Sequence, residues 1–211
     1  MKKIAAFALL FIFLSNISIY CQQRTADSLI AALGQLSGEN KVDALNRISD
    51  LYNNINCKVA IEYAEKAVDL AKAINYTKGL GGGFGCLGFS YINLDKQKAV
   101  YYTQKALEIR RKIQDKPGIG RSLNVLGLIN YFMGDYVTSI DYHLQALKIR
   151  EEIGDYNQIF SSYNNISIVY LMLEDYNTAL AYLNKALDAS LKAGRIPAIV
   201  YDNIGDIYSR T

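Results

Sequence analysis

A motif that recurs about every 39 residues constrains the fold of this chain more than any other feature. Its clear copies lie at residues 86–91, 125–128, 165–170 and 203–208, and a fainter copy lies at residues 48–52. The equivalent positions are separated by 39, 39, 40 and 38 residues: Ile48, Leu87, Leu126, Ile166 and Ile204. A fixed period of this length is typical of repeat proteins, in which each unit buries its apolar face by stacking on the next.

Each complete copy is predicted to form two α-helices. In the first helix, Leu123, Leu126 and Gly127 are spaced i, i+3 and i+4 and form one stripe. Small residues recur in this stripe and in the second helix, where they allow close approach: Gly88, Gly127, Ser167 and Gly205, and Ala106, Ala146 and Ala186. Turn-forming residues lie between the two helices, at 133–136 and 173–176, and between successive copies, at 115–118 and 154–155. The pattern predicts stacked helical hairpins.

The motifs Leu-Gly-x-x-Tyr, Gly-Asp-Tyr and Ala-Leu, in five registers, resemble the tetratricopeptide repeat in a long form of about 40 residues. The resemblance implies an all-α fold, a right-handed α-solenoid of stacked antiparallel helix pairs. It covers residues 41–211, with repeats that start near 42, 81, 120, 160 and 198, the last one incomplete. Thr103 and His143 depart from the pattern, because an aromatic residue is usual there. Residues 22–40 are expected to form a leading helix that caps the stack.

The first 21 residues have the layout of a secretory signal, in which Lys2 and Lys3 precede an apolar run at 4–14 and polar residues follow. The run is shorter than a membrane-spanning helix, which needs about 20 predominantly apolar residues. We therefore expect export to the periplasm or cell surface, with cleavage near Cys21. Lipidation of Cys21 is the alternative, although the bulky Tyr20 precedes it. Membrane attachment would then come from the signal segment, that lipid or a downstream helix.

Composition argues against several classes of function. The 23 Lys and Arg nearly balance the 20 Asp and Glu, so no nucleic-acid partner is expected. His143 is the only histidine beside three cysteines, and no nucleophile–base pair or metal-ligand cluster appears in the sequence. Residues 83–88 match the dinucleotide fingerprint G-x-G-x-x-G but follow a predicted helix, where the fingerprint needs a strand. We therefore predict no metal, no cofactor and no enzymatic activity.

Three smaller features carry predictions of their own. Cys57 and Cys86 are interpreted as two small buried thiols in preference to a disulfide.

The charged runs at 110–112 and 148–152 lie at the ends of second helices. They are expected to remain solvated, with cations that complement the helix dipoles. Six glycines within residues 79–88 predict a weak helix, because glycine costs about 1 kcal/mol per helical position. We expect a hinge there, between the first two repeats.

The resemblance implies that partners bind as extended or helical peptides in a concave groove lined by first helices. Mapped onto this chain, the candidate groove residues are Asn46, Asp50, Phe89, Asn93, Arg121, Asn124, Tyr131, Asn164 and Asp202. Amides beside aromatic residues suit hydrogen bonds to a peptide backbone together with apolar anchors. Val125 and Leu128 stand where some family members carry a clamp for a C-terminal carboxylate, so binding of chaperone tails is not expected.

Together these features predict an exported scaffold that binds a protein or peptide. The signal segment and the long repeats resemble the exported regions of bacterial, Bacteroidetes-like sensor histidine kinases and regulators, which implies a role in signal transduction. The final repeat breaks off after one helix, so we expect a longer protein with an output domain beyond Thr211. The alternatives are a free-standing periplasmic or surface adaptor in an envelope complex and, as a third class, an enzyme.

Overall fold

The computed structural model describes residues 22–195 and 197–210. The predicted signal segment, with Cys21, lies outside the described residues. Over the described ranges the secondary structure consists of helices and short turns without strands. A helix over residues 22–32 is followed by α2 (Gly38–Tyr52), α3 (Cys57–Ala73), α4 (Thr77–Ser90), α5 (Lys96–Lys112), α6 (Lys116–Met133), α7 (Tyr136–Ile153), α8 (Tyr156–Met172), α9 (Tyr176–Lys192) and α10 (Ala198–Arg210).

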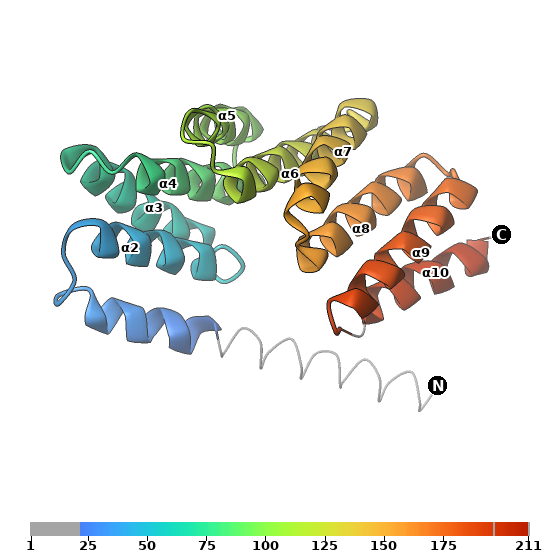
Figure 1. Cartoon of the computed structure of the whole chain (residues 1–211), viewed down its shortest axis with the longest axis horizontal. Coiled ribbons are helices and arrows are strands. Elements are labelled where there is room, and N and C mark those ends of the chain that lie inside the picture. The colour runs from blue at the N-terminus through green and yellow to red at the C-terminus, as the bar shows by residue number, and fades with distance from the viewer. Residues whose placement is uncertain (1–21, 196, 211) are drawn as a thin grey trace. The chain divides into compact units, whose positions relative to one another are not determined.

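The chain divides into two compact units between Ile109 and Arg110, within α5. In the first unit, α2 and α3 form a hairpin and α4 packs against both. In the second unit, α6 pairs with α7 and α8 pairs with α9, while α7 packs on α8 and α10 on α9. Figure 1 shows α8, α9 and α10 side by side, coloured from orange to red. These stacked helix pairs confirm the predicted all-α fold class.

Aspartate side chains mark where the helices of the second unit begin. Each accepts a hydrogen bond of 3.1 Å from the backbone N–H three residues later, and the four are Asp115, Asp135, Asp155 and Asp175. Gly134 and Gly154 end α6 and α7 with φ of 80° and 76°, in the left-handed region that glycine tolerates best. The turn-forming residues of the sequence therefore bound the helices.

Helices α6 and α7 pack closely where a glycine lies opposite a large side chain. His143 on α7 is 1% exposed, and a Cβ added to Gly127 on α6 would lie 2.6 Å from its Cε1 atom. The Ser139 hydroxyl also donates to the Gly127 carbonyl at 2.8 Å. In the preceding repeat, Thr103 packs against Gly88 in the same way. The two positions that depart from the aromatic pattern are therefore core positions, each matched to a glycine.

The glycine-rich segment forms the regular helix α4. A Cβ on Gly82 would lie 2.7 Å from Nδ2 of Asn46, and one on Gly83 would lie 2.7 Å from Cγ2 of Val68. These glycines therefore allow α4 to approach both α2 and α3 closely. Whether the segment also acts as a hinge stays a prediction.

Candidate functional site

The predicted groove residues lie on or beside first helices of both units, and we call the surface that they occupy in each unit its first-helix face. In the first unit, Asn46 and Asp50 lie on α2, Phe89 lies on α4, and Asn93 follows α4. In the second unit, Arg121, Asn124 and Tyr131 lie on α6, Asn164 on α8 and Asp202 on α10. Each of the two compact units carries one such face.

In the second unit, asparagines of this face connect neighbouring first helices. Asn165 on α8 donates from Nδ2 to Oδ1 of Asn124 on α6 at 3.0 Å. Asn203 on α10 donates in the same way to Asn164 on α8 at 3.2 Å. Asn164 is buried, and Asn124 is half-buried. These amides already serve packing between repeats, so a partner would have to compete for them.

The first unit uses its polar residues similarly. Asn46 donates from Nδ2 to the carbonyl of Gly79 at 3.0 Å, and its buried Oδ1 has no hydrogen-bond partner among the described residues. Asp50 accepts a bond of 3.3 Å from the thiol of Cys86. Phe89 and Asn93 are exposed and therefore available to a partner.

Exposed apolar side chains gather at the carboxyl ends of α6 and α8, two helices that contact one another. Phe132 on α6 and Met172 on α8 occupy the same position of successive repeats, and each is 51% exposed. One turn earlier stand Leu128 and Ile168, which are half-buried. Half-buried Tyr131 supports Phe132 through an edge-on ring contact with centroids 5.2 Å apart. We call Leu128, Phe132, Ile168 and Met172 the α6/α8 apolar surface.

Two arginines in the charged runs are buried, and the expectation that these cations are solvated is wrong for them. Arg110 donates from Nη1 to the Gly118 carbonyl at 3.2 Å and to the Ser122 hydroxyl at 2.8 Å. Arg150 donates from Nη1 to the Gln158 carbonyl at 3.1 Å and to the Ser162 hydroxyl at 2.5 Å. Each arginine thus fastens the end of one repeat to the start of the next. The available signal was an Arg followed 12 residues later by a Ser, which occurs at the same place in both repeats.

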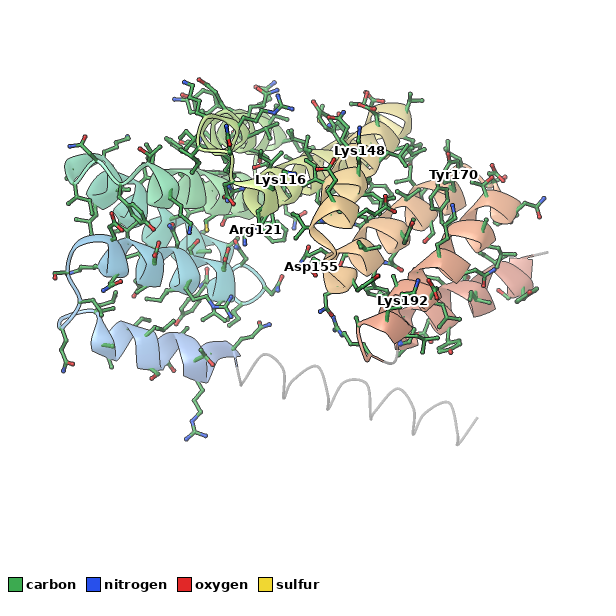
Figure 2. All side chains as sticks on the ribbon, viewed as in Figure 1. Lys116, Arg121, Lys148, Asp155, Tyr170 and Lys192 are labelled. Carbon is green, nitrogen blue, oxygen red and sulfur yellow. The ribbon has the colours of Figure 1, made fainter. Side chains whose placement is uncertain are left out.

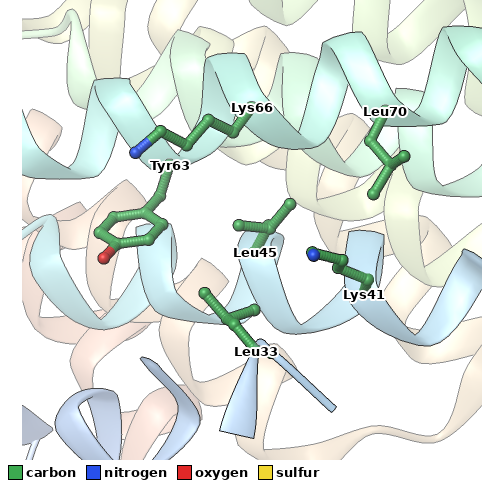
Figure 3. A pocket seen from close by; sticks show the side chains of 7 residues that line it. Leu33, Lys41, Leu45, Tyr63, Lys66 and Leu70 are labelled. Atoms are coloured by element: carbon green, nitrogen blue, oxygen red, sulfur yellow. The ribbon is translucent and has the colours of Figure 1, made fainter. Parts of the chain in front are cut away.

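A cavity of about 390 Å³ lies in the first unit, between the turn after the helix over residues 22–32 and helices α2 and α3. Figure 3 shows its walls, in which apolar side chains are flanked by two lysines: Leu33, Leu45, Tyr63 and Leu70, with Lys41 and Lys66. The Lys66 ammonium lies 4.9 Å from the centre of the Tyr63 ring. The predicted groove residues do not line this cavity, and sequence reasoning missed it because its walls come from three separate segments.

The ionisable side chains of the described ranges do not form a metal centre, since no three His, Cys, Asp or Glu residues there are grouped to hold an ion. Burial and, secondarily, the charge of Arg150 lower the pKa of His143 to about 4. Cys86 is buried and Cys57 half-buried, and no disulfide joins them. None of the helices in the described ranges is both long and apolar enough to span a bilayer.

Comparison with known proteins supports the helical repeat. A tetratricopeptide repeat family model matches residues 84–152 and 119–192, which together span more than half of the 211 residues. No curated protein matches the sequence.

Similar solved structures come from several proteins. Aspartyl phosphate phosphatase F from Bacillus subtilis is 19% identical, with a TM-score of 0.74 over 91% of this chain and 54% of its own. A Rap protein complexed with competence and sporulation factor is 18% identical, with a TM-score of 0.75 over 86% of this chain and 52% of its own. A signal transduction ATPase with a tetratricopeptide repeat sensor, from Pyrococcus horikoshii, is 24% identical, with a TM-score of 0.67 over 91% of this chain and 30% of its own.

This chain therefore spans about half the length of the first two proteins and less of the third. At these identities the likeness concerns the fold alone. The family model covers the middle of the predicted array, residues 84–192, and the structure forms stacked helix pairs there. The chain belongs to the tetratricopeptide repeat family.

Proposed function

We propose that this chain is an exported scaffold that binds a protein or peptide on its first-helix faces and serves as the sensory region of a longer signalling protein. The observation that carries the binding role is the α6/α8 apolar surface. Phe132 and Met172 expose half of their area at matching positions of two adjacent helices, where an apolar anchor of a peptide would cover both. The similar structures of a factor-bound Rap protein and of a repeat sensor support the analogy.

Binding is tested with a displayed peptide library and the purified chain. We expect Phe132→Asp and Met172→Asp to abolish capture of the selected peptides, because each places a charge where an apolar side chain docks. The matched control is Val137→Asp on α7, which changes an exposed apolar residue (80% exposed) outside this surface. Far-UV circular dichroism checks that all three variants remain helical. Equal binding by all three would contradict the proposed surface.

Export and the signalling context rest on the N-terminal pattern and the resemblance of the repeats, and they need a separate experiment. An immunoblot of fractionated source cells measures the size and location of the natural product. A membrane-bound band much larger than 23.6 kDa supports the sensory region of a longer protein. A soluble periplasmic band slightly below that mass supports the free-standing adaptor instead.

A further inference from the structure

A small cavity in the second unit lies where the carboxyl end of α7 meets the amino ends of α6 and α8. Its volume is about 90 Å³. Gly120 and Ile153 form uncharged parts of its wall. Its charged lining residues are Lys116, Arg121, Arg150 and Asp155. Figure 2 labels Lys116 and Arg121 on α6 and Asp155 at the start of α8.

Arg150 brings unused hydrogen-bond donors to this cavity. Its side chain is 4% exposed, and its bonds to Gln158, Ser162 and Asn124 all come from Nη1. Nε and Nη2 therefore donate to no group in the described part of the chain. An arginine carries five N–H donors, and the donors that Arg150 does not use within the protein are left to solvent or to a ligand. The unused edge of this guanidinium is suited to an acceptor that enters the cavity.

The charges around the cavity favour an anion. Lys116 pairs with Glu152 at 2.9 Å, and Asp155 caps α8 by accepting from the Gln158 N–H at 3.1 Å. The three cations Lys116, Arg121 and Arg150 thus face two carboxylates, which leaves one positive charge without compensation. Burial, partly offset by Asp155, lowers the pKa of Arg150 to about 10, so the guanidinium is still charged at neutral pH.

We infer that this cavity binds a single oxyanion group of the size of a carboxylate. The volume is well above the minimum for one water and small beside ligand pockets of about 300–1,000 Å³, which suits one such group. The guanidinium fork matches the two oxygens of a carboxylate, and such charge-assisted bonds are among the strongest in proteins. Arg121 is exposed, also lines the cavity and adds a second cation. The cavity residues are not those of the α6/α8 apolar surface. A free carboxylate and a carboxylate on a peptide side chain would make the same contacts in this cavity, so the inference does not rest on the peptide-binding proposal.

The test follows the arginine Nε–H signals of the ¹⁵N-labelled full chain by NMR. Sodium acetate is titrated against sodium chloride at equal ionic strength to probe a free carboxylate. N-acetylglutamate amide and N-acetylglutamine amide probe a peptide side chain with and without the charge. We expect the Arg150 signal to shift and saturate with acetate, or with the glutamate compound alone if the peptide is the source. Shifts no larger than those with chloride, or equal shifts with both amides and none with acetate, would overturn the inference.

Variants locate the binding. Arg121→Gln is used because Arg150 also joins two repeats, and its replacement endangers the fold. We expect Arg121→Gln to weaken binding of the effective probe by at least about fivefold, from the loss of one charge-assisted contact. Lys148→Gln removes an exposed cation of α7 that does not line the cavity, and it should leave the affinity unchanged. Equal affinity of Arg121→Gln and the unchanged chain would refute this location. The peptide-library experiment concerns another surface, so its failure leaves this result unaffected.

Discussion

Lowering the pH from 7 to 5 should destabilise this protein through one side chain, His143. The imidazole is buried against Gly127, its Nδ1 has no hydrogen-bond partner among the described residues, and its pKa falls from 6.5 to about 4. The unfolded chain therefore takes up a proton below pH 6.5, whereas the folded chain stays neutral at this site until about pH 4. Linkage then predicts that the free energy of unfolding falls by about 2 kcal/mol between pH 7 and pH 5, and that the loss levels off below the folded pKa.

The assay is urea unfolding followed by far-UV circular dichroism at pH 7, 6 and 5. Because His143 is the only histidine, its NMR titration in the folded protein also reports the pKa directly. His143→Gln removes the titrating group and should show a much smaller change over this range. The pKa values of Asp135 and Asp175 are lowered from the ordinary 3.8, chiefly by their hydrogen bonds with Thr138 and Thr178. Protonation of these two side chains therefore destabilises the protein only at a lower pH than the range studied for His143. An imidazole that titrates near 6.5 in the folded state would refute this reasoning, as would an unchanged pH dependence in His143→Gln.

Other consequences of the packing are measurable. Gly127→Ala should lower the free energy of unfolding by about 1–3 kcal/mol, because its Cβ would collide with the imidazole. Gly205→Ala, in α10 with open space around it, should instead stabilise by up to about 1 kcal/mol, and equal effects would contradict the packing argument. A double-mutant cycle of Asn124→Ala and Asn165→Ala should give a coupling of about 0.5–1 kcal/mol, whereas strict additivity would argue against their bond. Amide exchange should be faster at residues 79–88 than in α6, and equal protection would rule out the hinge.

The sequence pattern predicted the repeated helix pairs because the period, the turns and the small residues are all local signals. The close approach of α6 and α7 at Gly127 also follows from the pattern, whereas His143, which lies opposite this glycine, departs from the pattern. The role of Arg150 did not follow, because a charged residue near a helix end is usually solvated, and its acceptors lie in the next repeat. The asparagine bonds were missed for the same reason. An amide on a first helix suits a peptide as well as a neighbouring helix, and only three-dimensional placement distinguishes the two.

That distinction bears on which residues would govern recognition in the second unit. Asn124 and Asn164 already make hydrogen bonds between first helices, so a partner that uses them must exchange one bond for another, with little net gain. A partner that covers Phe132 and Met172 does not have to break such bonds. Burying their exposed apolar surface contributes a favourable free energy of about 25 cal/mol per Å². Substituting the asparagines should therefore lower stability more than affinity, and substituting the two apolar residues should do the reverse. If the asparagine variants instead lost peptide binding at unchanged stability, recognition would depend on the amides, and the α6/α8 apolar surface would be secondary.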